Sequence, residues 1–154
     1  MDRPLELLHQ NVANVVKIIE VFEDDLKDYK EHLRLKGKNL VVANNEQPSW
    51  LVYYDARRTK LKASLDFMEA HVQSVRGKLW KDYTENYSRD LQTKDKEQYI
   101  NNEPNFLNAY ELYLELKELY DRYVAIVDAF KARGYALNNI TRLVSSEMTD
   151  YIID

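Results

Sequence analysis

The feature that most constrains the fold is a heptad pattern of apolar residues. In residues 51–83, one face presents apolar side chains at alternating steps of three and four residues, interrupted only by Arg58. The members of this seam are Leu51, Tyr54, Leu61, Leu65, Met68, Val72, Val75 and Leu79. A repeat of this kind is typical of a long helix that packs lengthwise against another helix.

A second seam of the same kind occupies the N-terminal residues. Its members are Leu5, Leu8, Val12, Val15, Ile19, Phe22, Leu26, Tyr29 and Leu33. The pattern predicts a helix over about residues 3–35, with Gly37 as its stop signal. Asparagines and a proline make residues 36–48 a predicted connector, in which the apolar run 40–42 could form a strand.

The seam of residues 51–83 predicts a second helix, which Ser49 would cap and which would extend to about Tyr87, with Gly77 as a point where it could break. At about 1.5 Å per residue, an unbroken rod of this kind would be on the order of 55 Å long. Such a rod exceeds the diameter of a compact domain of 154 residues. The two N-terminal helices are therefore expected to form an antiparallel hairpin over residues 1–88.

Residues 89–154 predict three further helices: a short one capped by Thr93, one over about 104–133 that Gly134 ends, and one over about 136–152. The middle one is apolar on two sides, so most of its surface must be covered. In a short chain we expect other subunits to supply part of this cover, which makes the region an oligomerisation region. The stripe assigned to the subunit interface is Leu112, Leu116, Leu119, Tyr123, Ile126 and Phe130.

Composition agrees with a single all-α domain over residues 1–154. Only three glycines and three prolines are present, which favours long helices over many short strands. Cysteine is absent, so disulfides and thiol chemistry are excluded. The N-terminus lacks the apolar run of a signal peptide, and no stretch approaches about 18 consecutive apolar residues. We therefore expect a cytoplasmic protein that does not enter membranes.

Positive charge is concentrated in residues 36–81, where nine Lys and Arg against four Asp and Glu give +5 in a chain of net charge −4. Tyr53, Tyr54 and Phe67 lie close to the densest basic cluster, and cations beside aromatic faces are typical of single-strand nucleic-acid binding. The residues assigned to DNA contact are Arg57, Arg58, Lys60, Lys62, Arg76 and Lys78. The alternative is a solvated helix face whose aromatic residues, Tyr54 above all, are packed.

The sequence offers no arrangement that would support an enzyme. His9, His32 and His71 lie on separate predicted helices without a partner at metal-binding spacing, so solvated or helix-flank histidines are expected. No glycine-rich phosphate loop is present. We expect no catalysis, no metal and no cofactor.

Three stretches within residues 55–143 are similar to one known family. The first, TKLKASLDFM, resembles that family's segment Leu-Lys-Ala-Arg-Leu-Asp-Tyr-Tyr. The last stretch, AIVDAFKARGYALNNI, resembles the family's C-terminal pattern. The stretch between these two, LQTKDKEQYINNEPNFLNAYELY, resembles the segment that connects them in the family. The order and the spacing match those of the recombination mediators of T-even phages, the UvsY-like family.

This resemblance implies a homo-oligomeric ring, heptameric or hexameric, that binds single-stranded DNA without enzymatic activity. It implies loading of a phage RecA-like recombinase onto strands coated by a phage single-strand DNA-binding protein, in recombination, replication and repair within the infected bacterium. Lys62 corresponds to a family lysine implicated in DNA contact, whereas Ser64 replaces the family's arginine. We expect Arg57, Arg58 and Lys60 to supply the missing charge. The alternative function is a helical structural or adaptor protein of a phage that does not bind DNA.

Overall fold

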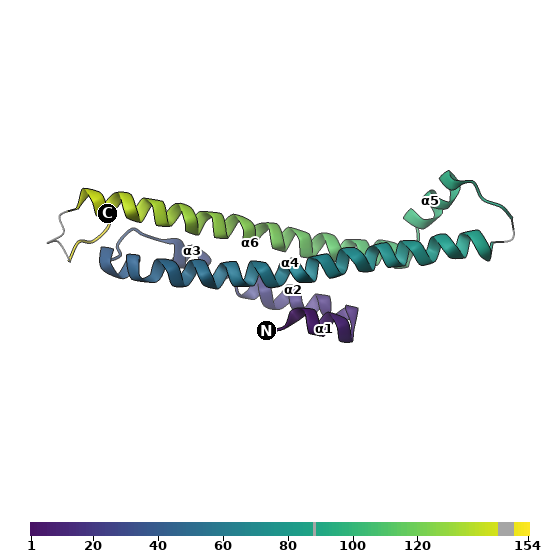
Figure 1. Ribbon diagram of the computed structural model, residues 1–154, viewed down its shortest axis with the longest axis horizontal. Helices are drawn as coiled ribbons and strands as arrows, with labels where there is room; N and C mark the ends of the chain where they lie inside the picture. Colours follow the sequence, from purple (N-terminus) through teal and green to yellow (C-terminus); the bar gives the residue numbers. More distant parts are fainter. Residues whose placement is uncertain (88, 145–149) are drawn as a thin grey trace.

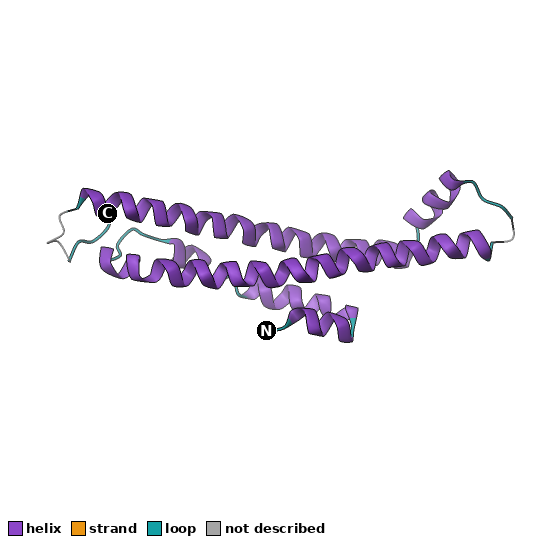
Figure 2. Ribbon diagram, in the orientation of Figure 1, coloured by secondary structure: helices purple, strands orange, loops and turns teal. Residues whose placement is uncertain are grey.

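The computed structural model describes residues 1–87, 89–144 and 150–154. Its main feature is an antiparallel pair of long helices, α4 (Leu40–Glu85) and α6 (Pro104–Leu143), shown in Figure 1. At about 1.5 Å per residue, the 46 residues of α4 span about 70 Å. Helices make up the regular structure of the described residues apart from one isolated bridge, Asn39 to Ile152, so the all-α class is confirmed (Figure 2).

The N-terminal seam forms several short helices. These are α1 (Pro4–Gln10), the 3-10 turn η1 (Val12–Asn14), α2 (Val15–Asp24) and α3 (Tyr29–Leu33). Asn11 ends α1 because its backbone is extended and its side chain accepts a hydrogen bond from the Ala13 N–H (2.9 Å), which competes with helical bonding. The prediction of one helix over residues 3–35 is therefore wrong, although most of its apolar positions are buried.

The partners of the hairpin also differ from the prediction. Helix α4 pairs with α6 along most of its length, while α1 packs on α4 and α2 packs on α6. Among the described helices, α6, with 40 residues, is the closest to α4 in length. The two halves of the chain, 1–88 and 89–154, thus contribute one arm each to the hairpin.

Helix α4 begins at Leu40, well before the predicted start at Ser49. The side chain of Asn39 caps it by accepting hydrogen bonds from the N–H groups of Val41 (3.0 Å) and Val42 (3.2 Å). Pro48 lies inside the helix without ending it. The prediction of a connector over residues 36–48 is wrong from Leu40 onward, and the run 40–42 forms the first helical turn rather than a strand.

The C-terminal residues bind the turn that precedes α4. Leu40 N–H donates to the Tyr151 carbonyl (2.8 Å), and Ile153 N–H donates to the Lys38 carbonyl (2.9 Å). Gly37 completes this contact, since its φ of +79° allows its N–H to reach the Ile153 carbonyl (2.6 Å). These bonds hold the end of the chain beside the start of α4.

Neither Gly77 nor Gly134 interrupts its helix. Helix α6 passes through Gly134 and ends at Leu143, so the predicted stop is wrong. The predicted last helix, 136–152, is the end of α6 as far as Leu143, and residues 145–149 of that prediction lie outside the described residues. The glycine at 134 has a packing reason, because a Cβ there would lie 3.0 Å from Nε2 of Gln47 on α4.

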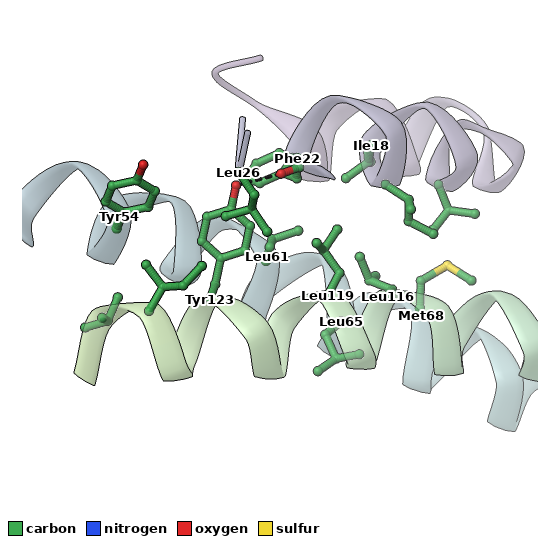
Figure 3. Close-up of a cluster of buried hydrophobic side chains, with 14 of the residues drawn as sticks. Ile18, Phe22, Leu26, Tyr54, Leu61, Leu65, Met68, Leu116, Leu119 and Tyr123 are labelled. Carbon is green, nitrogen blue, oxygen red and sulfur yellow. Dashed lines mark hydrogen bonds between the residues drawn. The ribbon is translucent and has the colours of Figure 1, made fainter. Parts of the chain in front are cut away.

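The main core forms where α2 crosses the α4–α6 pair (Figure 3). It contains Ile18, Phe22, Leu26, Tyr54, Leu61, Leu65, Met68, Leu116, Leu119 and Tyr123, among others. The Tyr123 hydroxyl donates to the Phe22 carbonyl (2.8 Å), which supplies the partner that a buried hydroxyl requires. At the far end, the short helix α5 (Thr93–Asn101) buries Ile100 in a second cluster with Val72 and Phe106.

The two helical glycines should respond differently to alanine. Gly77→Ala should raise the free energy of unfolding by about 1 kcal/mol, because no atom lies within 4 Å of the new methyl group. Gly134→Ala should raise the free energy of unfolding by less than Gly77→Ala does, or should lower it. The reason is that the new methyl group displaces Gln47, whose amide donates to the Phe130 carbonyl (2.5 Å). Urea denaturation followed by circular dichroism measures both. Equal stabilisation by the two substitutions would contradict the close contact with Gln47.

Candidate nucleic-acid interface

The six basic residues assigned to DNA contact all lie on α4, but they do not form one surface. Arg57 and Lys78 are separated by about 32 Å along the axis at 1.5 Å per residue. Residues that are about five turns apart return to the same face, so Lys60 and Lys78 share one flank, while Arg58 and Arg76 share the other. The apolar seam runs between these flanks.

Arg57 points into the subunit. Its side chain is 11% exposed and forms an ion pair with Asp25, just after α2. The guanidinium lies over the Phe22 ring, 4.4 Å from the centroid, and 5.5 Å from the Tyr53 centroid. This placement corrects the assignment of Arg57 to DNA contact: the residue fastens α2 to α4, and its charge is already matched.

The next three basic residues each lie beside a carboxylate. The pairs are Arg58 with Asp55 (2.9 Å), Lys60 with Asp2 (3.8 Å) and Lys62 with Asp66 (2.5 Å). The hydrogen bond to Asp66 raises the pKa of Lys62. Exposed pairs of this kind are weak and exchange readily with other anions. The charge of this segment is therefore largely balanced within the subunit, but it remains accessible at Lys62.

Arg76 and Lys78 have a different environment. Arg76 lies over the Phe106 ring, 4.6 Å from its centroid, and donates to the Asn101 side-chain oxygen (2.9 Å). Lys78 is exposed, and neither residue has a carboxylate within ion-pair distance among the residues that the structure describes. The exposed ring of Tyr110 stacks on Phe106 with centroids 5.8 Å apart. Two cations and one accessible aromatic ring, that of Tyr110, are therefore present here, while Phe106 itself is buried.

The aromatic residues near the first basic cluster are mostly packed. Tyr54 is fully buried, so its expected packing is confirmed. It shares a hydrogen bond with Nδ1 of His32 (2.8 Å), and the His32 ring stacks on Trp50 with centroids 3.5 Å apart. Phe67 is partly buried against the main core, which leaves Tyr53 as the more exposed aromatic of the three that the sequence singled out. His32 thus belongs to an aromatic stack rather than to a solvated flank.

Ser64 is part of the packed seam of α4. Its side chain is fully buried, and its hydroxyl donates to the Lys60 carbonyl (3.2 Å) one turn earlier. An arginine at this position would begin inside the packed seam. A small side chain at position 64 therefore suits the packing of α4 in this subunit.

An aromatic group near α5 was not identified from the sequence. The rings of Tyr83, Tyr87 and Tyr99 lie in mutual contact, with centroids 5.7 to 6.2 Å apart. Nearby, the Lys96 ammonium lies 5.3 Å from the centroid of the Trp80 ring. The sequence signal for this group is the four-residue spacing of Tyr83 and Tyr87. Their contact with Tyr99 depends on how α5 folds back, which the sequence does not specify.

The stripe assigned to the subunit interface lies inside a single subunit. Leu116, Leu119, Tyr123, Ile126 and Phe130 are buried in the main core, and Leu112 is partly buried against it. They are covered by α2 and α4 of the same chain. The assignment is therefore corrected for the five buried residues, which stabilise the fold of the subunit, whereas Leu112 remains partly accessible.

Within residues 1–87, 89–144 and 150–154, no three His, Asp or Glu residues lie together as a group that could hold a metal ion. In the same residues, none of the helices combines the length and the apolar character needed to cross a membrane. Comparison of the chain with protein-family models, curated proteins and solved structures finds no match.

The buried Arg57 should matter more for stability than the adjacent Arg58. Arg57→Gln should lower the free energy of unfolding by about 3 kcal/mol, because it leaves the Asp25 carboxylate unpaired against the core. Arg58→Gln is the matched control and should cost less than about 1 kcal/mol, since its partner is exposed. Chemical denaturation followed by circular dichroism measures both. Equal losses would contradict the structural role of Arg57.

Acidification should weaken the His32 stack. Burial lowers the pKa of His32 below its ordinary value, so the folded state favours the neutral ring. The resulting stability is fully present above the unfolded pKa of about 6.5 and is lost as the pH falls below it. Denaturation at a series of pH values should therefore show a steeper loss on acidification for the unmodified protein than for His32→Gln, which retains His9 and His71. Identical pH profiles would contradict this prediction.

Proposed function

We propose that the protein is a recombination mediator that binds single-stranded DNA and helps to load a RecA-like recombinase onto strands coated by a single-strand DNA-binding protein. It would act without enzymatic chemistry, through geometry and charge. The DNA contact is assigned to the accessible cations of α4, namely Lys62, Arg76 and Lys78. The bound strand would pass from Lys62, at the middle of α4, toward the end of the α4–α6 pair that carries α5.

The observation that carries this function is the arrangement around Arg76. A cation without a carboxylate partner among the described residues lies over Phe106, and the exposed Tyr110 stacks on that ring. Single-stranded nucleic acid is bound by cations along its backbone and by aromatic faces for its bases. Both kinds of group lie within one short stretch of the molecule, whereas Lys78, two residues further along α4, lies on the other flank of the helix, so a strand that contacts both residues crosses α4.

The sequence resemblance supplies the second support. The segment similar to the family's lysine motif lies on α4, and the segment similar to its C-terminal pattern lies on α6. These two helices are the arms of the hairpin, so the similar segments belong to one structural unit. Lys62, the counterpart of the family's DNA-contacting lysine, has an exposed side chain.

Assembly into a ring, heptameric or hexameric, belongs to the same proposal. A few cations per subunit would bind DNA weakly, and repetition around a ring raises the combined affinity by multivalency. Since the stripe 112–130 is buried in the subunit, another surface must form the ring contacts. Leu107 and Leu114 are exposed apolar residues on one side of α6, seven residues apart, which is the spacing of a helix-packing stripe.

A helical structural or adaptor protein that does not bind DNA is the second candidate. The observation that favours it is the balance of charge around Arg57, Arg58, Lys60 and Lys62, each of which has a carboxylate within ion-pair distance. This balance leaves less free positive charge than the sequence indicates. The two candidates differ in one measurable property, which is salt-sensitive binding of single-stranded DNA.

Neutralising Arg76 and Lys78 should weaken DNA binding. We expect the unmodified protein to bind a short fluorescein-labelled single-stranded oligonucleotide with an affinity that falls as salt rises. The double variant Arg76→Gln/Lys78→Gln should reduce the slope of log K against log salt by roughly 1.4, because each lost phosphate contact removes roughly 0.7. Fluorescence anisotropy at several salt concentrations measures the slope.

The control variant is Lys30→Gln/Lys36→Gln, which removes the same charge from exposed positions near the opposite end of the molecule. It should leave the slope close to that of the unmodified protein. Light scattering establishes that both variants keep the unmodified mass in solution. If the unmodified protein shows no salt-dependent binding, the adaptor candidate replaces the mediator. If both variants lose the same slope, the contact does not lie at Arg76 and Lys78.

A further inference from the structure

An apolar groove lies where the N-terminal helices stop short of the end of the α4–α6 pair. Figure 1 shows α1 and α2 beside the central part of the pair, which continues beyond them toward α5. The groove has a volume of about 600 Å³. Its apolar lining includes Val12 and Val16 from the N-terminal region, Val75 and Leu79 from α4, and Leu112 from α6.

This groove continues a packing layer that α2 begins. Along the main core, α2 covers the apolar seam between α4 and α6. Val75 and Leu79 extend that seam past the start of α2, where they are only partly buried. Val16, at the junction, is 47% exposed. One further helix laid in the groove would bury these side chains in the same way that α2 buries the central seam.

The other end of the groove is strongly acidic. Val16 also lines a second hollow of about 310 Å³, whose walls carry two glutamates from α2 and two from α6. These are Glu20, Glu23, Glu115 and Glu118. Arg122 lies 3.9 Å from Glu23, but the other three glutamates have no cation within ion-pair distance among the described residues. Like charges facing one another across a hollow favour an occupant that carries positive charge.

The two hollows together have the length of a short helix. They extend on α6 from Asn105 to Arg122, which is about 26 Å at 1.5 Å per residue. A helix of roughly 17 residues spans this distance. Lys78 lines the apolar end, opposite the glutamates. The dipole of a docked helix then favours an orientation with its N-terminus toward the glutamates and its C-terminus toward Lys78.

We propose that this groove is the docking site for an amphipathic helix of a partner protein, with an apolar stripe and flanking Lys or Arg residues. The apolar stripe would occupy the hollow around Val75 and Leu79, and the basic residues would face the four glutamates. A second copy of this chain fits less well, because the basic segment of α4 around Arg57–Lys62 is already paired with carboxylates of its own subunit. The inference goes beyond the proposed function and does not require DNA binding.

The test uses two fluorescein-labelled synthetic peptides of about 18 residues, the length of the two hollows together. Both carry the same leucine stripe at helical spacing, and their flanks are lysine in one and glutamate in the other. In fluorescence anisotropy the lysine peptide should bind at least about tenfold more tightly than the glutamate peptide. Glu115→Lys/Glu118→Lys should reverse this preference, and it should do so without changing the apolar groove.

Val16→Asp should weaken binding of the lysine peptide by at least about tenfold, since it places a charge against the apolar stripe. The matched control is Val52→Asp, because Val52 is 67% exposed and lies outside the groove. It should leave the affinity unchanged. Equal binding of the two peptides, or an unchanged preference in the glutamate variant, overturns the proposal. If the Val16→Asp variant has a lower mass in light scattering than the unmodified protein, the occupant of the groove is a second copy of the chain. That result also overturns the proposal.

Discussion

The structure depends on the contact between two apolar seams, one on α4 and one on α6. Neither helix can be stable alone in water, because most of the stability of a protein helix comes from packing its apolar face. Paired antiparallel, they bury Leu61, Leu65 and Met68 against Leu116 and Leu119, and α2 closes the third side (Figure 3). The other elements are arranged around this pair.

Polar groups fix how the short helices attach to the pair. At the α2 crossing, Tyr123 donates to the Phe22 carbonyl and Arg57 pairs with Asp25, so these two side chains tie α6 and α4 to α2 and the residue after it. At the other end, Arg133 is almost fully buried; its Nη1 donates to Oε1 of Gln47 (2.6 Å), and burial lowers its pKa. Such contacts select one arrangement, because each buried group left without a partner costs about 1–3 kcal/mol.

These contacts also determine which charges remain for function. The sequence concentrates basic residues around Arg57, but folding places a carboxylate beside each of them, from α2, from the N-terminus or from the adjacent turn of α4. The accessible cation and aromatic groups are left further along the pair, near Arg76. The early end of the N-terminal helices also leaves uncovered the groove near Val16, which Lys78 lines at its other end. The proposed DNA contact and the proposed partner site therefore both depend on where the short helices end.

The sequence by itself determined the helical class and most of the buried positions, because a heptad pattern is a local property that any packed helix must satisfy. Tyr54 and the apolar residues of the two seams are examples. Tertiary structure decided which helices pair, since α6 matches α4 in length and the N-terminal segment is broken at Asn11. It also decided that Gly134 continues a helix, that the stripe 112–130 faces its own subunit, and that Arg57 is buried. Each of these outcomes depends on a partner far away in the sequence, such as Gln47 for Gly134 or Asp25 for Arg57, and no local pattern specifies that partner.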